Sequence, residues 1–268
     1  MSKFFKAIKA FSILLKKPYL LNLILDDEEV KRKYVSEKYH LPDGLPTVDL
    51  LELFPDFKVE VTPYSFLDGS SLATDLGLLK MLCIKNNVED YFEIGTWRGE
   101  SVAVVAGSAK NCTTFNLPDD ELRKMGLPED YINMHRFFSK DLQNVKHLEG
   151  NSQHFDFSTL NQKFDLIFID GDHHTESIQK DTVNAFKLLK NEKSIIVWHD
   201  YGTGTETARF NVLQGILDGC PADKINNLYR VSNTLCAIYL PNKVKAEIIK
   251  PNTPPNKYYK INIETVQL

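Results

Sequence analysis

The stretch YFEIGTWRG, residues 91–99, decides the fold. Its first four residues are mostly aromatic or β-branched, which is typical of a short buried strand. Gly95 and Gly99 then frame a turn, and residues 99–109 are rich in Ala and Val, as in a packed helix. In α/β domains a strand, a glycine-framed turn and a helix bring the backbone close to a nucleotide-like ligand. We therefore expect an α/β domain with a ligand at this turn.

The same alternation of strands and helices continues on both sides of this stretch. Residues 71–86 place leucines at helical spacing, and residues 175–189 carry Ile178, Ala185, Phe186 and Leu189 on one face. Thr175 is the predicted N-cap of that second helix. Further strands are predicted at 112–115, 145–148, 164–169 and 194–198.

Two more strands are predicted near the end of this region, at 228–231 and 235–239. The three residues between them are too few for a crossover between parallel strands, so the pair is an antiparallel hairpin. The expected fold is a Rossmann-like, doubly wound, mostly parallel seven-stranded sheet that ends in this hairpin. Such open sheets bind ligands beyond the carboxyl ends of their strands.

The composition excludes several classes of protein. The 268 residues are 43% hydrophobic and 25% charged, as in a soluble globular protein. The net charge of −4 is too near balance for a nucleic-acid-binding surface. The four cysteines, which show no CxxC spacing, favour a reducing cytoplasm: Cys83, Cys112, Cys220 and Cys236.

The chain divides into three parts: residues 1–69, the α/β domain at 70–240 and an extension at 241–268. Residues 3–25 predict an amphipathic helix with five lysines, ending at an acidic run, and the proline-rich residues 42–63 predict an irregular connector. Two interpretations of this helix stay open. In the first, it packs on its own domain or on a second copy in a homo-oligomer; in the second, it attaches peripherally to the inner, anionic face of a membrane. Neither a signal peptide nor a membrane span is expected. A last strand is expected over 258–266.

The turn at 95–99 favours some ligands over others. A dinucleotide motif would need glycine where this chain has Trp97 and Glu100. The indole blocks close approach of the backbone, and the carboxylate repels a pyrophosphate at the helix N-terminus. A cationic or phosphate-free ligand suits this turn better.

The stretch from Glu93 to Gly99 resembles the first motif of the class I S-adenosylmethionine-dependent methyltransferases. That motif has an acid, one spacer, a glycine, three spacers and a second glycine, which here are Glu93, Gly95 and Gly99. The resemblance covers about residues 70–240 and extends to FDLIFIDGDH (164–173) and IIVWHDY (195–201). Together these motifs are similar to the macrocin-type sugar O-methyltransferases. The resemblance implies methyl transfer to an oxygen of a small acceptor, a sugar or a glycan-related molecule.

The resemblance also implies which residues bind S-adenosylmethionine. Glu93, Gly95 and Gly99 would line its methionine end, with Thr96 and Trp97 in the same turn and Asp170 beside it. The ribose and adenine positions, where the family pattern has acids, are Asn116 and Asn151-Ser152 in this chain. An amide still donates and accepts hydrogen bonds, without the charge assistance of a carboxylate.

A second group of polar residues follows two strands that the family places side by side. Converging carboxylates repel each other unless a cation or proton is shared, and oxygen-rich clusters favour Mg²⁺, Ca²⁺ or Mn²⁺. By resemblance, Asp170 and Asp200 become metal ligands and Asp172 the base, while His199 stands where the pattern has an acid and joins the ligands. Strand alternation predicts that His199 and Asp200 face opposite ways. Metal-free chemistry with His173 or His199 as the base is the alternative.

Two functions of other classes stay open. Asp170-Gly171-Asp172 also satisfies the D-x-D pattern by which glycosyltransferases hold a nucleotide sugar through a divalent metal. Because Asn116 and Asn151 replace the expected acids, the chain is alternatively a non-catalytic binding module. Such a module would keep the fold and attach to a membrane or a partner through its basic N-terminal helix.

Overall fold

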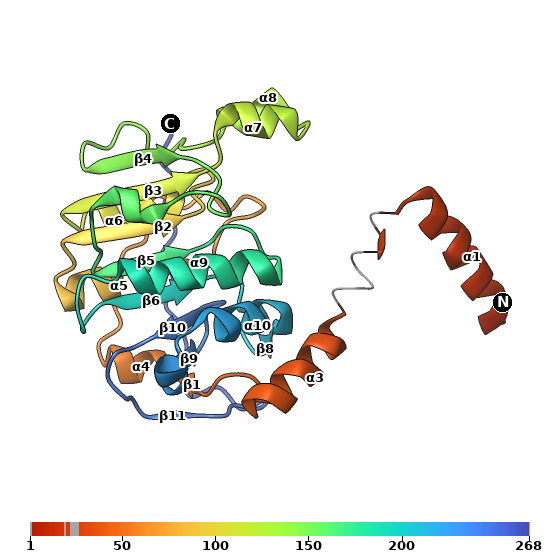
Figure 1. The fold of residues 1–268 in the computed structure, drawn as a ribbon. Helices are drawn as coiled ribbons and strands as arrows, with labels where there is room; N and C mark the ends of the chain where they lie inside the picture. The colour runs from red at the N-terminus through yellow and green to blue at the C-terminus, as the bar shows by residue number, and fades with distance from the viewer. Residues whose placement is uncertain (1, 19, 22–26, 268) are drawn as a thin grey trace.

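The computed structural model describes residues 2–18, 20–21 and 27–267. A nine-stranded sheet lies at its centre, in the order β11-β1-β9-β10-β6-β5-β2-β3-β4 (Figure 1). The seven predicted strands are all present: β2 (Asp90–Ile94), β3 (Asn111–Asn116), β4 (Val145–Glu149), β5 (Leu166–Ile169), β6 (Ile195–Trp198), β9 (Leu228–Val231) and β10 (Ala237–Tyr239). The mostly parallel α/β sheet is confirmed.

The strand order reverses between β2 and β5, and this reversal positions the site. The chain runs outward through β2, β3 and β4, then returns to place β5 on the other side of β2, followed by β6. These strands are parallel, with Ile94 opposite Ile169 and Ile169 opposite Trp198. The residues that follow β2, β5 and β6 therefore meet at one edge of the sheet. β10 is antiparallel to β6 and to β9, which confirms the predicted hairpin.

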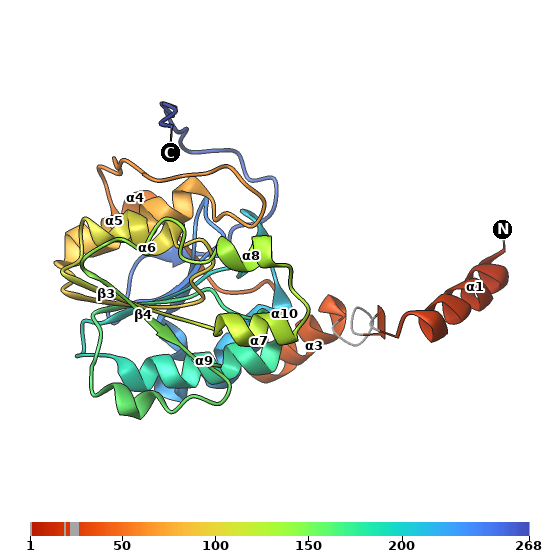
Figure 2. The same cartoon turned by 90° about the horizontal axis from the view of Figure 1, so that it is seen from above.

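Helices cover both faces of the sheet, and each face has its own apolar core (Figure 2). One face carries α4 (Leu50–Leu53), α5 (Ala73–Asn86) and α6 (Glu100–Ala106). The other carries α3 (Glu28–Tyr39), α9 (Thr175–Leu188) and α10 (Phe210–Gly219). Short elements lie in the connecting segments: α7 (Asp119–Lys124), α8 (Glu129–Asn133), η1 (Phe157–Leu160), β7 (Gly202–Gly204), β8 (Thr207–Ala208) and η2 (Ala222–Asn227).

Several segments differ from the expectation. The connector at 42–63 is only partly irregular, because β1 (Thr47–Val48) pairs with β9 and with β11 (Ala246–Glu247), and α4 follows it. The sheet thus has nine strands rather than seven, since two-residue strands leave no periodic signal. Residues 258–266 form no strand, and the N-cap of α9 is His174 rather than Thr175.

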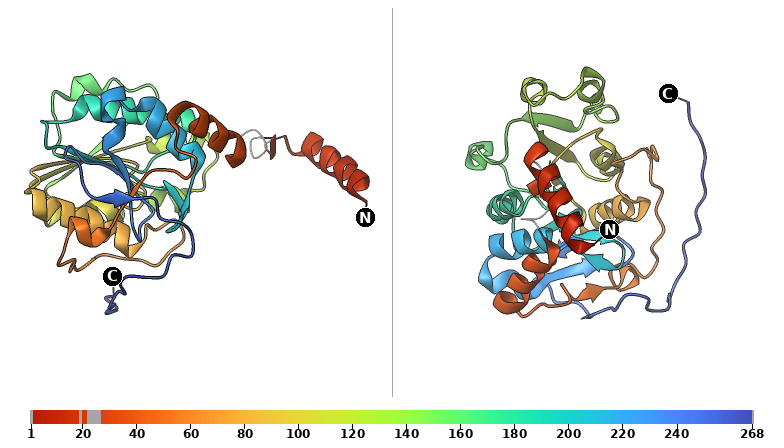
Figure 3. Two further views of the ribbon diagram at one scale, coloured as in Figure 1. Left: turned by 90° about the horizontal axis from the view of Figure 1, so that it is seen from below. Right: turned by 90° about the vertical axis from the view of Figure 1, so that its right-hand side faces the viewer.

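The N-terminal helix α1 spans Lys3–Lys16, and none of its residues is buried. It projects away from the sheet and its helices (Figure 3). The predicted continuation of this helix through residues 22–25 lies outside the described residues. From the acidic run at its expected end, Asp27 is the N-cap of α3 and Glu28 and Glu29 form its first turn; α3 packs on α10. Of the helices that the structure describes, none is long and apolar enough to cross a membrane.

Candidate active site

The turn between β2 and α6 needs its two glycines for close packing. Gly95, Trp97 and Gly99 all have positive φ, at 95°, 44° and 77°. A Cβ on Gly95 would lie 1.9 Å from the carbonyl oxygen of Asp170, and one on Gly99 would lie 2.1 Å from Ser139 Oγ. Gly95 therefore lets the turn lie directly against the end of β5, and Gly99 lets it lie against Ser139. This packing brings the predicted cofactor turn to Asp170.

Several buried polar atoms around this turn have no hydrogen-bond partner. They are Glu93 Oε1, Thr96 Oγ1, Trp97 Nε1 and His135 Nε2, each on or beside residues 93–97. Buried polar atoms in proteins almost always have a partner, so a group of orphans in one place indicates a ligand site. The residues present thus fit a polar cofactor at the turn.

Glu93 lies beneath the turn and is completely buried. Its Oε2 accepts a hydrogen bond of 2.7 Å from the hydroxyl of Tyr91. Burial raises the pKa of Glu93 to about 8, and the charge of Asp170 raises it further, against the lowering effect of Tyr91 and Ser101. At neutral pH the carboxyl is therefore mostly protonated, and a cationic group nearby would favour its ionised form.

The hollow at the turn is small, about 30 Å³. Its walls are residues 96–101 and Asp170, together with Gly69 and Ser71 from the loop before α5. Arg98 holds this loop against the turn, because its guanidinium donates to the carbonyl of Asp68 and to Ser70 Oγ and pairs with Glu100 at 3.1 Å. Small-molecule pockets usually measure 300–1,000 Å³, so in this conformation the hollow is smaller than a whole nucleoside needs. A hollow of about 350 Å³ lies along α3 instead, away from the strand ends, so volume alone does not mark the site.

The predicted ribose residue contacts the glycine turn, whereas the predicted adenine residues hydrogen-bond with the neighbouring Gln153. Asn116 Nδ2 lies 3.0 Å from His135 Nδ1, and Asn116 Oδ1 lies 3.4 Å from the amide of Thr96. The Oδ1 of Asn151 accepts from the amide of Gln153, and Ser152 lies between them. Their roles toward the cofactor stay predictions.

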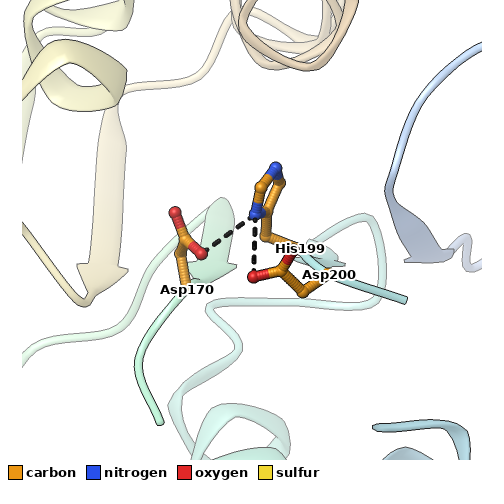
Figure 4. Close-up of side chains that lie close together, drawn as sticks. All are labelled: Asp170, His199 and Asp200. Carbon is orange, nitrogen blue, oxygen red and sulfur yellow. Dashed lines mark ion pairs between the residues drawn. The ribbon is translucent and has the colours of Figure 1, made fainter. Parts of the chain in front are cut away.

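Asp170, His199 and Asp200 form the cluster at the ends of β5 and β6 (Figure 4). His199 Nδ1 lies 3.1 Å from Asp170 Oδ1 and 3.5 Å from Asp200 Oδ2. The parallel register of the two strands places positions 170 and 199 side by side. Asp200 has a φ of 52°, which interrupts strand alternation and turns its side chain toward the same cluster. The expectation that His199 and Asp200 face opposite ways is therefore wrong.

A residue that the sequence analysis missed completes this cluster. Asp75, fully buried on α5, places its Oδ2 3.1 Å from His199 Nε2 and accepts hydrogen bonds from the amides of Leu72 and Leu235. The available signal was a single acid among the leucines that form the apolar face of residues 71–86. Burial alone lowers the pKa of His199, but Asp170, Asp200 and Asp75 raise it well above its usual value. These three carboxylates therefore favour the imidazolium form of His199.

The cluster fits a divalent cation. One donor atom from each of Asp170, His199 and Asp200 lies within 4.8 Å of the others, and the buried His199 Nδ1 has no partner of hydrogen-bond geometry. Asp75 fixes the other ring nitrogen, as carboxylates do for metal-binding histidines. Two carboxylates and an imidazole suit Mn²⁺ better than Mg²⁺.

The other predicted catalytic residues lie at the rim. Asp172 accepts from Ser177 Oγ at 2.8 Å and contacts His174 Nδ1 at 2.5 Å. Burial opposes ionisation of Asp172, but these hydrogen bonds hold its pKa below the usual value. His173, half exposed, places its Nε2 3.2 Å from Asp200 Oδ2. The structure thus brings His173, and not Asp172, to the cluster.

Residues 92–201 match a family model described as a methyltransferase domain, a range that includes the end of β2, the glycine turn and the whole Asp170–His199–Asp200 cluster. A search of curated proteins found no match. One solved structure with a similar fold is an O-methyltransferase from Bacillus cereus in complex with SAH; it is 15% identical, the alignment covers 78% of this chain and 96% of that chain, and the TM-score is 0.44. A second is cofactor-bound Rv0187 from MTB, which is 18% identical; the alignment covers 65% of this chain and 82% of that chain, with a TM-score of 0.44. A third is CalS10, an amino pentose methyltransferase from Micromonospora echinaspora; it is 12% identical, the alignment covers 49% of this chain and 51% of that chain, and the TM-score is 0.36. These similarities are too low to transfer an acceptor or a site residue. Residues 92–201 of this chain thus match a methyltransferase domain.

Proposed function

We propose that this chain methylates a hydroxyl oxygen of a small carbohydrate or glycan precursor, with help from a divalent cation. One observation carries the proposal: the ligand atoms of Asp170, His199 and Asp200 converge directly beside the glycine turn. S-adenosylmethionine supplies an electrophilic methyl group on a sulfonium, and a bound divalent cation lowers the pKa of a hydroxyl. The chain's own residues then have to align the acceptor and remove its proton.

The division of tasks follows from the contacts. Asp170, His199 and Asp200 would hold the cation, and Asp75 orients His199. His173 is the base in this proposal, because its imidazole reaches Asp200 from the exposed rim. Asp172 was the predicted base, but its carboxylate is already bonded to His174 and Ser177.

A hydroxylated acceptor suits the rim of the cluster. The side chains of Asp172, His173 and His174 are about half exposed or more and offer several hydrogen-bonding groups. The carbohydrate class itself rests on the similarity of the motifs to the macrocin-type enzymes. The D-x-D interpretation requires Asp170 and Asp172 to share one cation, and the contacts of Asp172 do not favour it.

Binding and turnover measurements test this proposal. Calorimetry should show binding of S-adenosylmethionine, and no binding of a uridine diphosphate sugar. Protein treated with a chelator should lose methyl transfer to a panel of sugar nucleotides and free sugars and regain it with Mn²⁺. Full activity after exhaustive chelation would exclude the metal, and binding of the nucleotide sugar alone would favour a glycosyltransferase. A chain that binds neither ligand would be a non-catalytic module.

A further inference from the structure

The helix α1 exposes a continuous apolar face. Phe4, Ile8, Phe11 and Leu15 follow at intervals of four, three and four residues, so they lie along one side of the helix. Phe4 is 71% exposed, Phe11 64% and Leu15 72%. Large apolar side chains at such exposure, gathered on one helix face, indicate a surface that is covered by a partner.

The other side of α1 is strongly basic. Lys3, Lys6, Lys9 and Lys16 lie on the helix, Lys17 follows it, and residues 1–20 contain no acid. The whole chain has a net charge of −4, to which residues 1–20 contribute +5, leaving −9 for residues 21–268. The segment that carries the exposed aromatic face is thus net positive, while the rest of the chain is net negative.

We propose that α1 lies on the surface of an anionic lipid bilayer, with its apolar face in the acyl boundary and its lysines at the headgroups. Lysines on one face and Phe and Leu on the other are typical of interfacial helices. A second copy of the chain is a poorer partner, because two α1 helices packed through their apolar faces would leave both sets of lysines without an anionic counterpart. The rest of the chain, which is net negative, buries none of the residues of α1.

Sedimentation of the full-length protein with lipid vesicles tests this proposal without any measurement of turnover. The probes are vesicles of equal parts phosphatidylglycerol and phosphatidylcholine, and vesicles of pure phosphatidylcholine. We expect binding to the anionic vesicles that weakens severalfold on pure phosphatidylcholine and falls with added salt. Lys6→Glu/Lys9→Glu should weaken binding by at least about 25-fold, because loss of each lysine alone costs roughly fivefold near an anionic surface and each glutamate adds repulsion. Phe4→Ser/Phe11→Ser should weaken it at least about tenfold.

Matched controls separate α1 from the rest of the surface. Lys110→Glu/Lys193→Glu changes the net charge equally at exposed sites elsewhere, and Ile84→Ser removes an exposed apolar side chain from α5. Both should bind the anionic vesicles as the wild type does. Equal binding to both kinds of vesicle, no binding, or equal loss in the controls would overturn the proposal. It would also be overturned if sedimentation velocity showed a dimer that only Phe4→Ser/Phe11→Ser dissociates, since the face would then serve a second copy.

Discussion

Asp75 Oδ2 lies 3.1 Å from His199 Nε2, although the two residues are 124 positions apart in the chain. This contact leaves Nδ1 as the ring atom that His199 presents to Asp170 and Asp200. Asp75 is therefore a positioning residue for the proposed metal site.

Asp75→Asn keeps the shape of the side chain and removes its charge. We expect its Mn²⁺ affinity to fall about 10- to 100-fold, the usual effect of losing the carboxylate behind a metal-binding histidine. Titration calorimetry with Mn²⁺ measures the affinity, and circular dichroism verifies the fold. Asp90→Asn, which loses a carboxylate near the opposite end of β2, is the matched control and should bind Mn²⁺ normally. Equal affinity in the Asp75 and Asp90 variants would reduce Asp75 to a structural role.

Mn²⁺ affinity should rise with pH. The pKa of His199 without metal lies well above its usual value, so the cation has to displace a proton from the ring. Titrations in buffers of different ionisation enthalpy, at several pH values from 6 upward, should show stronger binding and release of about one proton. An affinity that does not change with pH would show that His199 is no ligand.

Glu93 makes stability depend on pH. Its pKa is about 8 in the folded chain, against the reference value of 4.5, so between these values the folded form binds more protons than the unfolded form. The stability contributed by protonated Glu93 is complete below about pH 4.5 and is lost as the pH rises to about 8. We expect the free energy of unfolding of Glu93→Gln to exceed that of the wild type by several kcal/mol at pH 8. Urea unfolding of both proteins without cofactor, at pH 5 and pH 8, measures this difference, and parallel curves would refute it.

Gly95→Ala should damage both the fold and the cofactor turn. Its Cβ would lie 1.9 Å from the backbone oxygen of Asp170, at a φ of 95° that alanine avoids. We expect a loss of a few kcal/mol in unfolding free energy and no measurable binding of S-adenosylmethionine. Gly107→Ala is the control, since nothing lies within 4 Å of its added Cβ and its φ is −74°. Similar stabilities for the two variants would contradict this account of the turn.

The parts of the site that follow from strand order could be predicted from the sequence. Gly95, Asp170 and His199 each come after a strand with a clear apolar pattern, and parallel pairing places those strand ends together. Neither the positive φ of Asp200 nor the contact of Asp75 leaves such a pattern. Both depend on tertiary packing, which brings α5 over the end of β6.

The outer strands show the same limit for the fold. β1 and β11 have two residues each, too few for an alternation of side chains to be visible. β1 forms because β9 offers it an unpaired backbone edge, and β11 then pairs with the outer edge of β1.

The place of β1 and β11 in the sheet decides how the gene can be shortened. A fragment trimmed to residues 70–240 would lose both strands and expose the unpaired backbone edge of β9. Such exposed edges promote aggregation by pairing with a strand of another molecule. A soluble expression fragment should start before Thr47 and continue past Glu247. Removing only α1 would keep the pairing of β11, β1 and β9 intact.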